Sequence, residues 1–236
     1  KDFDRSYLGM LDPLRQEGFS RIDSLPTTEL GIRFNDFEQY IETLSPAGRY
    51  DLRRKLRKAD RGPRFTLDVV DSLDDKTLDE VYKLYLDIVD EHDMKFELLP
   101  VSFFTNVPKH MPGCTKFFLW RLEGKLSAFL FCLVSDDVLL DYYAGLDYSI
   151  AHKYHLYFVK FRDVINWCIT HKVKKYEMGI TGYEAKRRLG FDFIPLYLYA
   201  KLCNPFFRPL FNGVCRFLKF ENFDPSLKSA RKKIVS

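Results

Sequence analysis

The segment of residues 138–178 constrains the fold more than any other part of the chain, because it combines both kinds of secondary structure. An apolar, aromatic strand is predicted over residues 138–143, and Gly145 and Asp147 are expected to end it. Residues 154–170 carry apolar side chains at helical spacing, and residues 175–178 form a second short strand. A strand, a helix of this length and a strand make a βαβ unit with parallel strands and a right-handed crossover.

Ligands of βαβ units bind at the carboxyl ends of the strands and at the start of the crossover helix. We therefore expect the chemistry of this chain within residues 142–155 and 179–190.

The rest of the chain predicts an antiparallel meander with covering helices. Helices are expected over residues 36–44, 49–61, 74–89 and 100–107, and strands over residues 65–69, 116–121, 126–134 and 193–202. Pro195 should lie at a bulge or an edge of the last strand, because proline cannot donate to a sheet ladder. The predicted class is α/β, with a mixed, mostly antiparallel sheet and a central parallel βαβ unit flanked by helices.

The 236 residues suit one large domain or one domain with a partial second one. Residues 1–35 are interpreted as a lead-in arm or the remnant of a preceding unit, residues 36–202 as the main domain and residues 203–236 as an aromatic, basic tail. Because the chain begins with Lys1 rather than a methionine, the natural N-terminus is expected upstream.

Composition limits the compartment and the partners. The five cysteines are odd in number, and none has metal-ligand spacing, so buried thiols in a reducing compartment and no metal site are expected. No apolar run of about 18 residues is present, which favours a cytoplasmic protein. The 22 phenylalanines and 14 tyrosines suit either an aromatic core or an apolar ligand.

Two segments carry positive charge beside apolar residues. The helix at residues 49–61 is either a solvated helix face or a dock for a phosphate-bearing partner such as a nucleotide tail, a carrier protein, tRNA or lipid headgroups. Residues 205–220 suit an interfacial anchor on an anionic membrane, which would make the protein peripheral at the inner membrane face, but docking on the domain's own core explains them equally well.

Three motifs together resemble the GNAT N-acyltransferase superfamily, and more narrowly its FemAB-type branch (the peptidoglycan biosynthesis/recognition group). They are RRKLRK at residues 53–58, YYAGLD at residues 142–147, and GITGYEAKRRLGF at residues 179–191. The resemblance covers roughly residues 36–202 and implies a GNAT fold with direct acyl transfer to an amine. It also implies a co-substrate, an acyl-CoA or an acyl carrier protein, rather than a tightly bound cofactor.

The resemblance and the predicted crevice suggest roles for individual residues. Asp141 or Glu184 is the expected base, and Tyr142, Tyr143 or Tyr183 is the expected acid. Alternation along the strand predicts that Asp141 and Tyr143 share one face and that Tyr142 takes the other. Lys186 is expected to contact the oxyanion or a phosphate. The plainer interpretation is that it is an ordinary surface lysine. Donor binding is expected from Gly145, Leu146, Lys153, Tyr154, His155 and Arg187.

One departure from the family affects the donor. The start of the crossover helix reads SIAHKYHLYF and lacks the glycine-rich pyrophosphate loop of acetyl-CoA-using members. This weakens acetyl-CoA as donor and leaves long-chain acyl-CoA, an acyl carrier protein or aminoacyl-tRNA. A Fem-like aminoacyltransferase is the second hypothesis. The branch implies two tandem GNAT-like units, and this chain holds one complete unit and a stub, which counts against that hypothesis. A non-catalytic binding module is the third.

Overall fold

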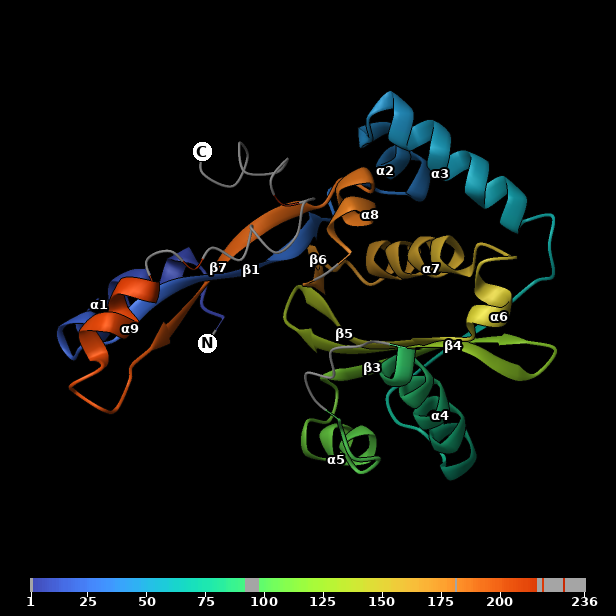
Figure 1. Ribbon diagram of the computed structural model, residues 1–236. Coiled ribbons are helices and arrows are strands. Elements are labelled where there is room, and N and C mark those ends of the chain that lie inside the picture. The colour runs from blue at the N-terminus through green and yellow to red at the C-terminus, as the bar shows by residue number, and fades with distance from the viewer. Residues whose placement is uncertain (1, 92–97, 181, 216–217, 219–226, 228–236) are drawn as a thin grey trace. The chain divides into compact units, whose positions relative to one another are not determined.

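The computed structural model describes residues 2–91, 98–180, 182–215, 218 and 227, and Figure 1 shows its elements. The chain divides into two compact units, a larger one of residues 30–178 and a smaller one that combines residues 1–29 with residues 179–236. Within the described ranges, no helix is both long and apolar enough to cross a bilayer.

The sheet of the larger unit has the strand order β2-β3-β4-β5-β6. Neighbours from β2 to β5 are antiparallel, and β5 and β6 are parallel, which confirms the mixed sheet. The strands are β2 (Thr66–Val70), β3 (Thr115–Leu122), β4 (Lys125–Ser135), β5 (Val138–Leu146) and β6 (Lys175–Gly179).

Helices cover both faces of this sheet (Figure 1). On one face lie α2 (Phe37–Thr43), α3 (Pro46–Ala59) and α7 (Leu156–Thr170), and on the other lie α4 (Asp75–Glu91) and α5 (Phe103–His110). Local caps explain where several begin: Asp36 accepts a hydrogen bond from the Gln39 amide at 2.8 Å, and Asp74 accepts one from the Thr77 amide at 2.7 Å. The crossover α7 between β5 and β6 confirms the predicted βαβ unit.

Two local predictions are wrong. Gly145 does not end the central strand, because β5 continues through it in register with Phe129. The crossover helix begins at Leu156 rather than Tyr154, because a separate short helix, α6 (Tyr148–Ala151), precedes it and is capped by Asp147.

In the smaller unit, β1 (Ser20–Gly31) pairs antiparallel with β7 (Asp192–Ala200). The register shifts between Ser24 and Thr27, so that Pro195 lies opposite the irregularity, as expected. The unit also contains η1 (Arg5–Tyr7), α1 (Leu8–Gln16), α8 (Tyr183–Arg188) and α9 (Arg208–Cys215). The predicted lead-in arm therefore supplies a strand, while the predicted domain limits stay a prediction.

Candidate active site

The parallel strands β5 and β6 part at Asp141. Their register pairs Val138 with Lys175, and Leu140 with Glu177 is the last pair. On its other side, β5 stays paired with β4 as far as Leu146. Asp141 is therefore the first residue of β5 beyond the parallel ladder, directly before the stretch of residues 142–155 where the sequence predicts chemistry.

A β-bulge at Tyr142 changes which side chains share a face. Phe131 of β4 pairs with Tyr143, and the next residue, Cys132, pairs with Asp141, which leaves Tyr142 as the extra residue. Cross-strand partners point to the same side of a sheet, and Phe131 and Cys132 point to opposite sides. The prediction that Asp141 and Tyr143 share a face is therefore wrong.

Ring contacts agree with this assignment. The Tyr143 ring lies 5.8 Å from the rings of Tyr85 and Phe103, on the side of α4 and α5. Tyr142, 46% exposed, stacks at 6.3 Å on Phe103. Asp141 lies on the α7 side, where its Oδ2 accepts a hydrogen bond from the Tyr176 hydroxyl at 3.4 Å.

The start of α7 lies among basic side chains of α3. His155 precedes α7 in the left-handed backbone conformation, with φ of 52°. Burial lowers the pKa of His155, and the nearby charges of Lys58, Lys55 and Arg54 lower it further. Lys55 also lies over the Phe158 ring at 4.3 Å. The fold thus brings two separately predicted features together, the basic helix and the first turn of the crossover helix.

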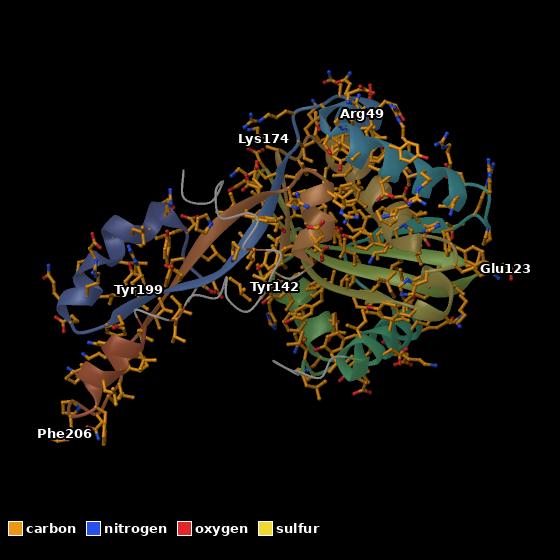
Figure 2. All side chains as sticks on the ribbon, turned by 45° about the horizontal axis from the view of Figure 1, so that its top comes forward. Arg49, Glu123, Tyr142, Lys174, Tyr199 and Phe206 are labelled. Atoms are coloured by element: carbon orange, nitrogen blue, oxygen red, sulfur yellow. The ribbon has the colours of Figure 1, made fainter. Side chains whose placement is uncertain are left out.

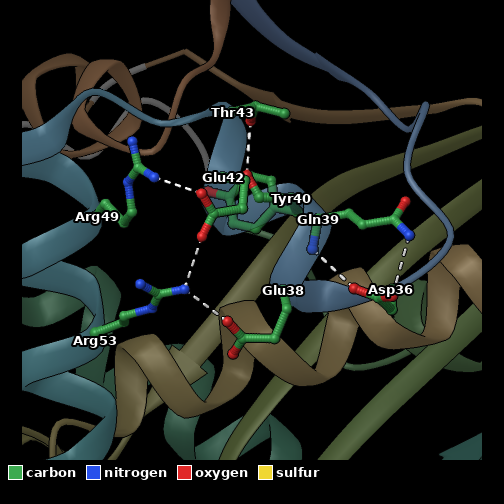
Figure 3. Close-up of polar contacts among 8 residues, drawn as sticks. All are labelled: Asp36, Glu38, Gln39, Tyr40, Glu42, Thr43, Arg49 and Arg53. Atoms are coloured by element: carbon green, nitrogen blue, oxygen red, sulfur yellow. Dashed lines mark hydrogen bonds and ion pairs between the residues drawn. The ribbon is translucent and has the colours of Figure 1, made fainter.

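Only part of the basic helix is available to a partner. Figure 3 shows that the N-terminal half of α3 is neutralised by α2. Arg49 binds Glu42 at 2.5 Å, and Arg53 binds Glu38 at 2.8 Å and Glu42 at 2.9 Å. Among the described residues, Arg57, Lys58 and Arg61 form no ion pair. Arg54 and Lys55 pair with Asp51 at 2.6 Å and 2.7 Å, so the positive charge that remains lies at the C-terminal end of α3 and just beyond it.

The other predicted donor-binding residues of the larger unit lie along β5 and the α6–α7 turn. Tyr154 packs on Gly62, because a Cβ added to Gly62 would lie 3.0 Å from Cδ1 of Tyr154. The Lys153 ammonium lies 5.0 Å from the centre of the Tyr154 ring. Gly145 faces the opposite side, under Phe129 and Leu84. Leu146 pairs with Ala128 at the end of β5. Their roles in donor binding stay predictions.

Lys186 is buried in the smaller unit, 6% exposed, and is not the surface lysine of the plainer interpretation. Its Nζ donates to the carbonyl oxygens of Gly179 at 3.2 Å and Ile180 at 3.3 Å. The Thr28 hydroxyl donates to the same Gly179 oxygen at 2.9 Å, and the Tyr183 hydroxyl donates to the Pro26 carbonyl at 2.9 Å. The bonds of Lys186 and Thr28 fix the backbone carbonyls of Gly179 and Ile180, and a contact of Lys186 with substrate stays a prediction.

Glu184 is engaged on the surface of α8. Its carboxylate binds Arg187 at 2.9 Å and Arg188 at 2.9 Å, and hydrogen bonds from these two guanidinium groups lower the pKa of Glu184. A weakly basic, ion-paired carboxylate is a poor proton acceptor. The i,i+3 and i,i+4 spacing of these pairs is visible in the sequence and is the signal that argues against Glu184 as the base.

Residues 47–187, more than half of the chain, match a family model described as an acetyltransferase (GNAT) domain. The chain belongs to the GNAT acyltransferase family. The match includes the basic helix, the β5–α7–β6 unit and most of α8. It confirms the predicted family, and with it a transferase enzyme domain.

Solved structures share the fold of this GNAT domain. L-PGS from Bacillus licheniformis superposes with a TM-score of 0.63 over 91% of this chain and 71% of that chain, at 10% identity. FemX gives 0.62 over 88% and 72%, at 12% identity. The C-terminal domain of a putative lysylphosphatidylglycerol synthetase from Agrobacterium fabrum gives 0.61 over 84% and 65%, at 13% identity. These likenesses, at 10–13% identity, show a shared fold.

Among curated proteins, the GNAT domain is 27% identical over 205 residues to a putative 8-amino-7-oxononanoate synthase 2 of Mycobacterium tuberculosis. The match covers 83% of this chain and 25% of that protein. The chain thus spans about a quarter of this relative's length.

Proposed function

We propose that this domain transfers an acyl group from a coenzyme A thioester to an amine by direct attack. The observation that carries the proposal is the convergence of Arg54, Lys55 and Lys58 on His155 at the start of α7. Asp51 pairs with Arg54 at 2.6 Å and with Lys55 at 2.7 Å, so Lys58 is the cation of this group that forms no ion pair among the described residues. A helix N-terminus beside such a cation favours phosphate groups, which coenzyme A carries and which the absent glycine-rich loop would otherwise hold. This is the same site at which βαβ units bind their ligands.

In the proposed reaction, the acceptor's ammonium first gives a proton to the Asp141 carboxylate. The amine nitrogen then attacks the thioester carbonyl carbon and forms the carbon–nitrogen bond. The carbon–sulfur bond breaks, and the second proton that the nitrogen loses ends on the leaving sulfur, which departs as the thiol. Asp141 is preferred over Glu184 because it lies where β5 parts from β6, whereas Glu184 is held by two arginines. Tyr143 lies on the face of the sheet opposite Asp141, so its predicted role as the acid has no support here, and the oxyanion contact of Lys186 stays a prediction.

A thermal-shift series tests the donor. The arms are coenzyme A, acetyl-CoA, a long-chain acyl-CoA, an acylated carrier protein and an aminoacyl-tRNA. A ligand at about 100 times its Kd stabilises the folded state by about 2.7 kcal/mol. We expect a shift with the CoA compounds that grows with acyl length.

Variants of α3 make the test specific. Lys58→Ala should weaken donor binding several-fold, whereas Arg57→Ala, the neighbouring cation that does not act on His155, should leave it unchanged. Arg53→Ala should also have little effect, because Glu38 and Glu42 already neutralise Arg53. An equal loss of donor affinity in all three variants would contradict a donor site beside His155.

Aminoacyl-tRNA is the second candidate donor. FemX and L-PGS superpose on most of this chain, and this likeness in fold favours the Fem-like aminoacyltransferase of the second hypothesis. A stabilising shift with aminoacyl-tRNA alone would support this alternative. Binding of a donor without turnover of any amine would instead favour a binding module.

We further propose that α9 attaches the protein to the cytoplasmic face of an anionic membrane. Phe206 is 86% exposed and Leu210 is 70% exposed, and Figure 2 shows Phe206 at the outer tip of the smaller unit. Polar bonds anchor α9 itself: Asn212 accepts from the Ser20 hydroxyl at 2.8 Å, and Arg208 donates to the Leu202 carbonyl at 3.3 Å. An exposed apolar helix face with an adjacent arginine suits a lipid interface.

A further inference from the structure

Arg162, in the middle of α7, forms ion pairs with two carboxylates at once. Its Nη1 donates to Asp60 Oδ1 at 2.8 Å, and its Nε donates to Asp163 Oδ1 at 3.3 Å. The other oxygen of Asp163, Oδ2, accepts a hydrogen bond from Trp120 Nε1 at 2.9 Å. Trp120 belongs to β3 and is fully buried, 0% exposed. A continuous series of polar contacts therefore runs from the core of the sheet through α7 to Asp60.

Asp60 lies at the end of the basic helix. It is the C-cap of α3 and the only carboxylate between Asp51 and Asp68. Its neighbours in the sequence are the cations Arg57, Lys58 and Arg61, which form no ion pair among the described residues. The bond from Arg162 therefore attaches α7 to the part of α3 whose positive charge is available to a partner.

Two further contacts bring the same part of the chain to the start of α7. Gly62, just beyond α3, packs on Tyr154, since an added Cβ would lie 3.0 Å from Tyr154 Cδ1. The Lys55 ammonium lies 4.3 Å from the centre of the Phe158 ring. Phe158 and Arg162 are four residues apart and are neighbours on one face of α7. The end of α3 thus lies along this face.

The Asp60–Arg162 bond differs from these contacts in its geometry. Packing on a ring tolerates sliding, whereas a hydrogen bond between charged groups fixes the distance and direction of both partners. The guanidinium is held at Nε as well as at Nη1, and Asp163 is held by an indole of the close-packed core. Because the attraction between exposed charges decays over about 10 Å at moderate salt, the placement of the α3 cations decides what they can bind.

We infer that Arg162 is a positioning residue for the donor, which holds the basic end of α3 against α7 so that its free cations face phosphate groups at the start of α7. The inference rests on the proposed function, in which this site binds coenzyme A. Arg162 itself does not touch the donor in this scheme.

The first test measures the affinity for coenzyme A in Arg162→Met, Arg162→Lys and Arg121→Met. Arg121 is the matched control, because it attaches β3 to Glu80 of α4 at 2.7 Å, on the other face of the sheet. We expect a several-fold loss of affinity in Arg162→Met, a smaller loss in Arg162→Lys, and no change in Arg121→Met. If Arg162→Met does not fold, Arg162→Gln takes its place.

Asp60→Asn separates positioning from charge by the sign of its effect. If charge alone decided binding, removing this carboxylate from the basic segment would strengthen the binding of an anion. Because the substitution also breaks the bond to Arg162, we expect weaker binding of coenzyme A. The losses from Arg162→Met and Lys58→Ala should also fall short of adding in the double variant, since one residue positions the cation that the other removes.

Hydrogen exchange of the amides of residues 55–61 tests the attachment without any donor. Exchange should be faster in Arg162→Met and Asp60→Asn than in the wild type and Arg121→Met. Unchanged exchange in Arg162→Met overturns the inference, and so does an affinity of Asp60→Asn equal to or above that of the wild type. If no CoA compound binds the wild type, the proposed function is overturned instead, and hydrogen exchange still decides whether Arg162 holds α3.

Discussion

At the residue scale, Gly145 is fixed by packing. A Cβ at this position would lie 2.2 Å from Cε1 and 2.6 Å from Cδ1 of Phe129, and 3.0 Å from Cβ of Leu84. These groups belong to the tightly packed core between the sheet and α4, so none of them can move freely. Glycine is therefore needed because the neighbouring ring fills the space of a side chain.

Gly145→Ala should lower the free energy of unfolding by about 1–3 kcal/mol, which is the usual cost of overpacking a core. Denaturant unfolding measures the difference. Gly9→Ala is the matched control, because an added Cβ there meets nothing within 4 Å and alanine favours the helix α1. A variant as stable as the wild type would show that Phe129 moves aside.

His155 gives a prediction with a defined sign. Burial and the cations of α3 lower its pKa below the ordinary value of 6.5, so the unfolded chain binds this proton more readily than the folded one. The stability that neutral His155 contributes is therefore present above about pH 6.5 and is lost as the pH falls through the lowered folded value.

His155→Asn should remove this pH dependence while keeping the backbone conformation, because asparagine tolerates positive φ. The free energy of unfolding of both proteins at about pH 7.5 and about pH 5.5 tests this. The wild type should lose more stability than the variant. Equal losses would mean that His155 does not sense the cations of α3.

At the scale of elements, α9 exposes apolar side chains instead of burying them. Hydrogen bonds of Asn212 and Arg208 hold the helix in place. The apolar side chains Leu210 and Val214 of the same helix are exposed to solvent. Residues 216–217, 219–226 and 228–236, which include much of the predicted basic tail, lie outside the described residues.

Leu210→Glu should reduce binding to anionic phospholipid vesicles at least several-fold, because a charge in the apolar face opposes insertion. Vesicle co-sedimentation measures this. Asp79→Glu, a change on the surface of α4 that keeps the charge, is a control that should bind as the wild type does. Undiminished binding of Leu210→Glu would rule out α9 as the attachment site.

At the scale of the whole molecule, the net charge of +4 says little about partners, because the charges are unevenly distributed. Arg49 and Arg53 of α3 are neutralised by α2, and Arg54 and Lys55 pair with Asp51, whereas Lys58, near His155, forms no ion pair among the described residues. We expect donor binding to weaken as salt rises, since a phosphate-bearing donor is held largely by charge. Titrations of donor affinity at several salt concentrations measure this.

The slope of that dependence distinguishes the donors. A polyanionic aminoacyl-tRNA should give a steep slope, and an acyl-CoA a shallower one, because its acyl chain also binds through apolar contacts. Salt-independent binding of every donor would contradict the assignment of α3 to phosphate.

The sequence by itself determined the elements of this protein and their class. Helical spacing, caps such as Asp36 and Asp74, and the strand–helix–strand order of residues 138–178 act over a few residues, so they are visible without a structure. The parallel β5–β6 pair was predicted in this way and is confirmed. The GNAT family was predicted from the resemblance of three motifs, and it is confirmed as well. The ion pairs of Glu184 were equally visible at helical spacing, although the sequence interpretation did not use them.

Only the tertiary structure decided which side chains meet. The bulge at Tyr142 depends on the register of β5 against β4, and it moves Asp141 to the face opposite Tyr143. The ion pair of Arg162 with Asp60 depends on how α7 packs against α3, and the free charge of α3 depends on the carboxylates of α2. Each of these features joins residues that are distant in the sequence. Local patterns carry no information about such contacts, because register and packing are settled only when the whole unit folds.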